Sequence, residues 1–126
     1  MVKFIKLWLP VFAWCGLIFF LSSIPGLKTP FGVIDTVLRK CAHVTEYFVL
    51  TLLLYRAFRK STQMPFSRLL FWSAALSFLY AASDEYHQTF VPHRSGRPLD
   101  VVIDLIGIFA AVFLYLKYRK KSYLRP

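Results

Sequence analysis

The sequence predicts an all-α integral membrane protein, a bundle of four transmembrane helices with both termini in the cytoplasm. Three observations predict it. Of the 126 residues, 57% are hydrophobic and the mean hydropathy is +0.52, whereas soluble domains are typically about 45 to 50% apolar. The apolar residues form four runs separated by polar segments. The 16 basic residues outnumber the 6 acidic ones and gather on alternate sides of these runs, as in membrane proteins.

The first predicted span, residues 7–24, lies in a stretch of 21 residues without a charge between Lys6 and Lys28. About 20 residues are needed to cross a bilayer. The proline and glycine at 24–26 end this span, because both interrupt a helix. No small-residue cleavage site follows, so we expect a retained anchor rather than a cleaved signal peptide.

The other three predicted spans carry charged residues at one end. They cover residues 35–58, 65–82 and 99–118, and with the first span they form a single domain, residues 1–126. Their uncharged stretches are only 9, 15 and 12 residues long, short of the about 20 that a full crossing needs. Polar side chains must therefore enter the membrane zone, where they face one another rather than lipid.

The basic residues predict the orientation, because cytoplasmic segments carry an excess of lysine and arginine. With the N-terminus inside, eleven fall on the cytoplasmic side: Lys3, Lys6, Arg56, Arg59, Lys60, Arg68, Lys117, Arg119, Lys120, Lys121 and Arg125. Five fall outside: Lys28, Arg39, Lys40, Arg94 and Arg97. All six acidic residues and all three histidines also fall outside, so we expect a polar site at the extracytoplasmic face.

Polar residues at the outer ends of three spans recur at helical spacing. The motif RKCAHVTEYFVL places on one face Arg39, His43, Glu46 and Tyr47. In the motif SDEYHQTF, one helix face carries Asp84, His87 and Gln88. Glu85 lies about a third of a turn away from that face. Span four begins with Asp100 and Asp104, whose face continues through Gly107 and Ala111. Small residues at this spacing let a neighbouring helix approach closely.

The motif RKCAHVTEYFVL, followed about 40 residues later by SDEYHQTFVPHRSGRPLDVVIDLIG, resembles the VanZ-like family of small bacterial membrane proteins. The similarity covers the chain from the first span to the fourth. It implies four transmembrane helices in the bacterial cell membrane and, from the founding member, resistance to the glycopeptide antibiotic teicoplanin. Family members often carry glycine where this chain has His93 and Ala111. The family has also been proposed to be related to enzymes that modify lipid head groups.

Three arginines suit the binding of an anionic lipid at the outer interface. A guanidinium group binds phosphate through two parallel hydrogen bonds, which Arg94 and Arg97, with Arg39, could supply. The ligand would be the phosphate head group of a phospholipid or of a polyprenyl lipid. The remaining polar residues complete the predicted substrate site: Tyr47, Glu85, Gln88, Asp100 and Asp104.

The histidines and carboxylates suit acid–base chemistry on a phosphoester bond. We expect His43 to act as general base or nucleophile, with its ring oriented by Glu46 or by a carboxylate of another helix. Asp84 and His87 are the second acid–base pair, and His43 and Asp84 are expected to meet across spans two and three. Together they suit hydrolysis or head-group exchange, so the chain is predicted to be a lipid phosphoesterase or transferase.

Other interpretations of the polar residues remain open. They could form only a structural network, or bind a divalent metal through His43, Glu46, Glu85 and His87, with further oxygen ligands from Asp100 and Asp104. The protein could instead bind a glycopeptide or cell-wall precursor without chemistry, or serve as a helper subunit of a membrane complex. No motif indicates an organic cofactor, and the basic residues lie between apolar runs rather than along one face, which excludes a nucleic-acid-binding class.

Overall fold

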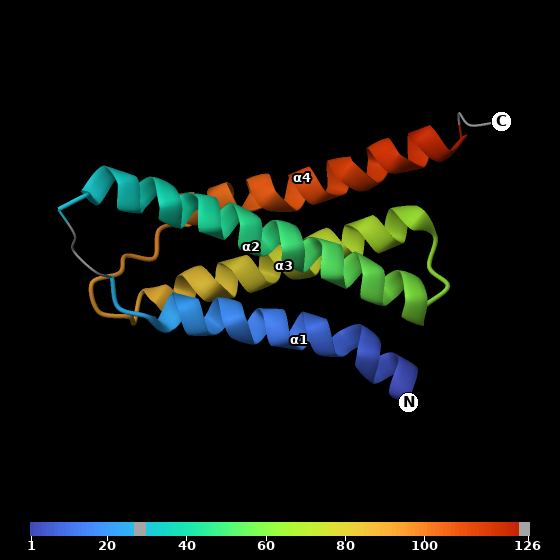
Figure 1. The fold of residues 1–126 in the computed structure, drawn as a ribbon, viewed down its shortest axis with the longest axis horizontal. Helices are drawn as coiled ribbons and strands as arrows, with labels where there is room; N and C mark the ends of the chain where they lie inside the picture. The colour runs from blue at the N-terminus through green and yellow to red at the C-terminus, as the bar shows by residue number, and fades with distance from the viewer. Residues whose placement is uncertain (27–29, 124–126) are drawn as a thin grey trace.

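The computed structural model describes residues 1–26 and 30–123, and the chain folds into four α-helices (Figure 1). They are α1 (Val2–Ser23), α2 (Gly32–Ser61), α3 (Phe66–Gln88) and α4 (Pro98–Tyr123). The all-helical prediction and its four elements are confirmed. Lys28 and Arg125, which we assigned to the outer and inner sides, lie outside the described residues.

The helix ends follow the signals in the sequence. After α1, Ile24 is extended, with ψ 126°, and the following proline and glycine prevent the helix from continuing. α2 and α3 extend beyond the predicted spans, so the polar motifs are helical. α1 and α4 are long and apolar enough to cross a membrane, and within residues 1–26 and 30–123 only these two helices meet that criterion. Charged residues interrupt the apolar stretches of α2 and α3.

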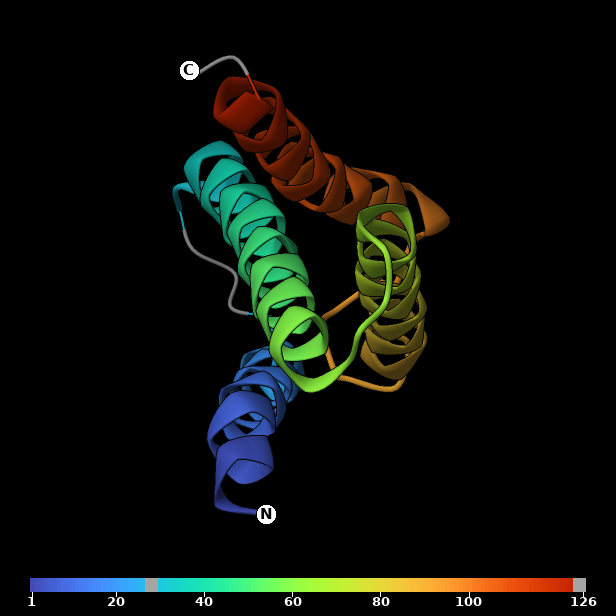
Figure 2. The same ribbon diagram turned by 90° about the vertical axis from the view of Figure 1, so that its right-hand side faces the viewer.

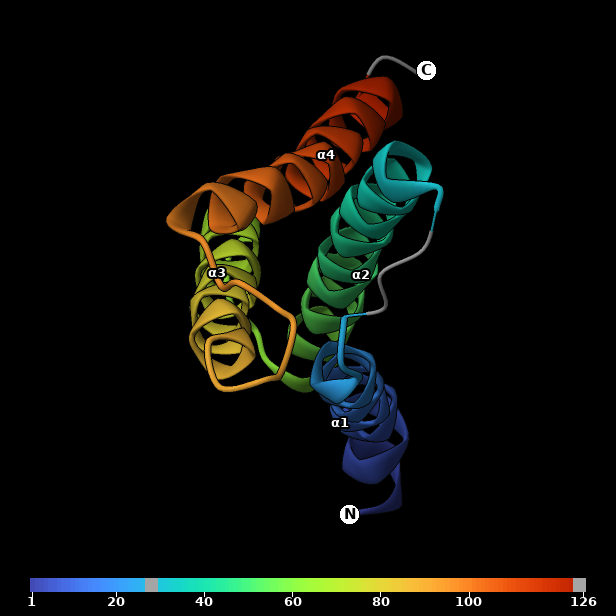
Figure 3. The ribbon, with the colours of Figure 1, turned by 90° about the vertical axis from the view of Figure 1, so that its left-hand side faces the viewer.

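The four helices pack side by side, and α2 contacts each of the other three. Its interface with α4 is the most extensive, and α3 covers both (Figures 2 and 3). The last turns of α1 and α3, the first turns of α2 and α4, and the connection at residues 89–97 lie together at one end of the bundle (Figure 1), here called the polar end. The N-terminus and the end of α4 lie at the opposite end, as expected for four helices that run in alternating directions.

Apolar residues fill the middle of the bundle, with Ile18, Tyr47, Leu50 and Ile108 almost completely buried. Side-chain hydrogen bonds add specific links between helices. In α2, the hydroxyl of Thr51 donates to Ser77 Oγ of α3 at 2.9 Å. α1 is fixed at two points: Trp14 Nε1 donates to the carbonyl of Glu46 at 2.9 Å, and Tyr80 Oη donates to that of Cys15 at 2.6 Å.

Small residues of α4 let it approach α2 closely, as the sequence predicted. A Cβ atom added at Gly107 would collide with the carbonyl oxygen of Val44. One turn further along α4, Ala111 is completely buried. Backbone contact of this kind is possible only where one helix carries no side chain. It brings the α4 residue Asp104 next to the α2 residue His43 at the polar end.

Candidate polar site

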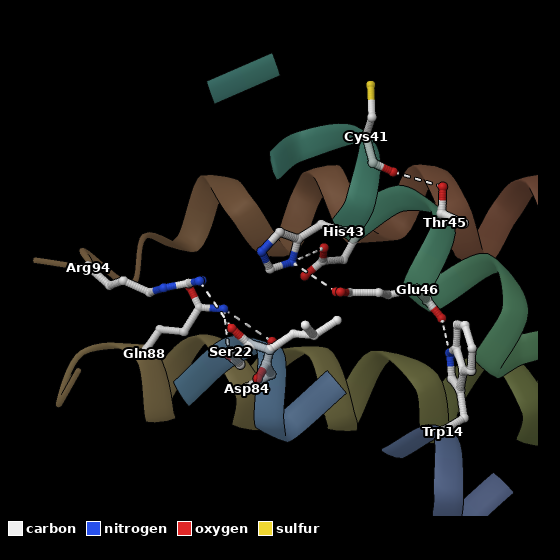
Figure 4. A network of polar contacts seen from close by, with 11 residues as sticks. Trp14, Ser22, Cys41, His43, Thr45, Glu46, Asp84, Gln88 and Arg94 are labelled. Carbon is white, nitrogen blue, oxygen red and sulfur yellow. Dashed lines mark hydrogen bonds and ion pairs between the residues drawn. The ribbon is translucent and has the colours of Figure 1, made fainter. Parts of the chain in front are cut away.

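A buried pair of His43 from α2 and Asp104 from α4 lies at the centre of the polar end (Figure 4). The Nδ1 atom of His43 lies 3.2 Å from Asp104 Oδ1 and 3.9 Å from Glu46 Oε2. The Asp104 side chain is completely buried, and those of His43 and Glu46 are only 12% and 14% exposed. The close approach of α2 and α4 at Gly107 therefore holds a histidine and two carboxylates together.

Several polar atoms of this cluster are buried without a hydrogen-bond partner among the described residues. They are His43 Nδ1, Tyr47 Oη and both carboxylate oxygens of Glu85 and of Asp104. Of these, His43 Nδ1 and Asp104 Oδ1 form the ion pair described above. Glu85 and Asp104 are 4% and 0% exposed. Because a buried polar group without a partner costs free energy, and a charged one costs most, such atoms in native proteins usually face a ligand, an ion or water. The cluster is therefore a candidate binding site for a ligand or an ion.

Three groups of the cluster have the spacing of metal ligands. One ligand atom each from His43, Glu85 and Asp104 lies within 4.8 Å of the other two. All three residues of this group, His43, Glu85 and the further oxygen ligand Asp104, are among the metal ligands that we derived from the sequence. Glu46 lies beside it at 3.9 Å from His43, whereas His87 turns toward α1.

His87 and Gln88 contact α1, and Asp84 accepts a hydrogen bond from Gln88 of its own helix. His87 Nε2 lies 3.0 Å from Ser23 Oγ, and its ring stacks on that of Phe19 with the centroids 4.6 Å apart. Gln88 Nε2 donates to Ser22 Oγ at 2.8 Å and to Asp84 Oδ2 at 3.2 Å.

This arrangement fits the expectation that Glu46 or a carboxylate of another helix orients the ring of His43, and it differs from the pairings that we expected for Asp84. We expected His43 to meet Asp84 and expected Asp84 to pair with His87. His43 instead pairs with Asp104, because α2 packs most closely on α4, while the His87 side of α3 packs on the last turn of α1.

Two adjoining cavities open at the polar end, one of about 200 Å³ and one of about 260 Å³. Arg39, His43 and Arg94 line both. Glu46 lines the first, and Gln88, Arg97 and Asp100 line the second. The three predicted phosphate-binding arginines thus line the cavities that also expose His43, the member of the buried pair that reaches them.

Arg94 also fastens residues 89–97 to the end of α1. Its Nε donates to the carbonyl of Ile24 at 2.8 Å, and its Nη2 donates to that of Leu21 at 3.1 Å. Partial burial, together with the positive charge of Arg39, lowers the pKa of Arg94 from 12.5. An arginine remains charged even so, and an anion bound between Arg39 and Arg94 would relieve their repulsion.

His93 occupies the one position in the described residues where a non-glycine side chain has a positive φ, 60°. This left-handed conformation favours glycine. It explains why members of the similar family often carry glycine here. The neighbouring backbone is tightly packed, since the amide of Gly26 donates to the carbonyl of Pro92 at 3.3 Å and a Cβ at Gly26 would collide with the carbonyl of His93.

Sequence reasoning missed the contribution of α1. Trp14, Ser22 and Ser23 contact the polar residues of α2 and α3, although we treated the first span as an anchor only. The pair of serines before the proline that ends this span was the available signal. Helical spacing within one segment could not reveal which neighbouring helix these hydroxyls face.

Comparisons with known proteins identify one family. A family model described as VanZ/LLP1 matches residues 7–119, which is nearly the whole chain. This confirms the resemblance drawn from the two polar motifs. No curated protein and no solved structure matches the chain.

Proposed function

The chain belongs to the VanZ/LLP1 family, and on this basis we propose that it is a multi-pass protein of the bacterial cell membrane that acts on lipid phosphate. Its polar end, at the extracytoplasmic face, binds the phosphate head group of a phospholipid or polyprenyl lipid. The bound phosphoester is then hydrolysed, or its head group is exchanged. The observation that carries the proposal is that His43, paired with the buried Asp104, lines two cavities that three arginines also line.

The outer surface of the bundle supports a membrane location. Large apolar side chains point outward along the two most apolar helices, among them Phe12 and Phe20 of α1 and Phe109 and Phe113 of α4, each more than 60% exposed. Soluble monomers rarely expose apolar surface on this scale. In a bilayer these side chains would contact lipid, while the polar residues of α2 and α3 face the other helices.

The division of polar residues within the site supports binding followed by chemistry. Arg39 and Arg97 are exposed at the cavities and carry the charge that would attract a phosphate group. His43 and Glu46 line the adjoining cavity at greater depth, next to the buried carboxylates. A head group held by the arginines would therefore present its phosphorus to the His43 cluster. Glu85 and Asp104 complete that cluster, and we assign Asp84, His87 and Gln88 to its support.

A turnover assay on purified protein tests the proposal. Wild-type protein in detergent is incubated with labelled phospholipids and labelled polyprenyl phosphates, and the released or exchanged head group is quantified. His43→Gln is expected to lose at least about 100-fold in rate, the usual scale of a lost catalytic side chain. His93→Gln is the matched control and should retain the wild-type rate, because His93 lies in the connection outside the cluster.

Other outcomes separate the alternatives. Binding of lipid or of a glycopeptide without turnover by the wild type would replace catalysis with a binding function. Turnover that survives His43→Gln unchanged would remove His43 from the reaction. Neither binding nor turnover would favour a helper subunit of a larger membrane complex.

A further inference from the structure

We infer that His43, Glu85 and Asp104 together bind one divalent transition-metal ion, of the class of Zn²⁺. The three residues come from three helices, α2, α3 and α4. The ion's part in a reaction rests on the proposed function, but its binding does not. No single sequence motif contains the site, because each helix contributes one ligand.

The spacing of the ligand atoms is close to that around a single ion. Zn²⁺ binds histidine nitrogen and carboxylate oxygen at about 2.0 to 2.2 Å. Three ligands of one ion therefore lie at most about 3.8 Å from one another. The candidate atoms of His43, Glu85 and Asp104 already lie within 4.8 Å of one another. Side-chain movements that bring these atoms closer together by up to about 1 Å would complete the coordination.

The unpaired carboxylates supply an independent reason for a cation. Both oxygens of Glu85 and both of Asp104 are buried with no hydrogen-bond partner in the described part of the chain. Their side chains are at least nine-tenths buried. Among the described residues, Asp104 has only the imidazole of His43 as a partner, at 3.2 Å, and none is found for Glu85, so two carboxylates this close repel and are poorly solvated. A divalent ion would neutralise both charges and satisfy the oxygens at once.

The donor set favours a transition ion over Mg²⁺ or Ca²⁺. Those two ions prefer oxygen ligands alone, whereas an imidazole nitrogen suits Zn²⁺ and its neighbours. Three protein ligands with an open fourth position are typical of catalytic rather than structural zinc sites. The open position here would face the cavities that His43 lines with the arginines. A water or a phosphate oxygen could occupy it, within reach of Glu46.

Titration of full-length protein tests the inference. The protein is purified in detergent without a polyhistidine tag, stripped with a chelator and titrated with Zn²⁺ by calorimetry, and the metal content is measured after desalting. We expect one Zn²⁺ per chain and a higher melting temperature. Asp104→Asn and Glu85→Gln should each weaken binding more than about tenfold, since even outer-shell changes typically cost that much. Asp35→Asn, the same change elsewhere at the polar end, should bind as the wild type does.

The melting temperatures of the metal-free variants show whether a loss of Zn²⁺ binding is caused only by misfolding. Glu85→Gln keeps the shape and removes one of two neighbouring charges without breaking the ion pair of His43 with Asp104, so without metal it should melt no lower than the wild type. A second readout needs no variant: Co²⁺ in a site with few ligands absorbs visible light far more strongly than the hydrated ion. Absence of that absorption, or Zn²⁺ affinity unchanged by both substitutions, overturns the inference.

The two proposals fail in different ways. Zn²⁺ binding without lipid turnover would refute the proposed function and leave the metal site standing. Turnover at an unchanged rate by chelated protein that binds no Zn²⁺ would refute the metal site and leave the proposed function.

Discussion

At the scale of single residues, the arginines of the polar end have different tasks. Arg94 donates hydrogen bonds to two carbonyl groups at the end of α1. Arg97 is exposed and lines the cavity of about 260 Å³ at the polar end. Arg97→Lys keeps the charge but removes the planar fork that binds phosphate through two hydrogen bonds. We expect it to weaken binding of anionic lipid, measured by native mass spectrometry, with folding unchanged. Equal affinity of the wild type for anionic and zwitterionic lipids would contradict this role.

His93 offers a test of local backbone strain. Its φ of 60° costs a non-glycine residue on the order of 1 kcal/mol or more. His93→Gly should therefore raise the melting temperature in detergent, whereas His93→Val, with a branched Cβ, should lower it. Lipid turnover should be the same for the glycine variant as for the wild type. A glycine variant that melts well below the wild type would show that the imidazole contributes more than the strain removes.

At the scale of helices, the α2–α4 contact decides whether the site forms. Gly107→Ala would drive a methyl group into the carbonyl of Val44, the residue after His43. The helices must then separate, and overpacking of this kind typically costs about 1 to 3 kcal/mol. We expect a lower melting temperature and, because His43 moves away from Asp104, loss of lipid turnover. Gly16→Ala is the matched control, since a Cβ there has nothing within 4 Å, and it should melt no lower.

At the scale of the whole molecule, charge asymmetry predicts which end faces the cytoplasm. All six acidic residues lie in the halves of α2, α3 and α4 nearest the polar end. The opposite end gathers basic and aromatic residues around a cavity of about 650 Å³, among them Arg59 and Arg119. Since cytoplasmic segments carry the excess of basic residues, the polar end is expected outside.

A pair of cysteine variants tests this orientation. In a background without Cys15 and Cys41, Ser95→Cys lies at the polar end and Ser67→Cys at the start of α3, and both positions are exposed. A membrane-impermeant thiol reagent applied to intact cells should label Ser95→Cys only. Ser67→Cys should react after the membrane is opened. Labelling of Ser67→Cys alone in intact cells would reverse the topology.

Much of the fold and the location of the site were predictable from the sequence. The apolar runs predicted four helices, the proline and glycine after Ser23 predicted where α1 ends, and Gly107 with Ala111 predicted a close helix contact. The gathering of acids and histidines predicted one polar end. These features depend on the periodicity and composition of single segments, and both can be counted in the sequence without knowing how the helices pack.

The pairings within the site were decided by tertiary structure alone. Helical spacing places His43 on a face of α2, but it cannot say whether that face meets Asp84 of α3 or Asp104 of α4. The packing of α2 on α4 at Gly107 selects Asp104, and the stacking of His87 on Phe19 turns that histidine toward α1. Contacts between helices depend on crossing and rotation, which are set by the fit of all the side chains together.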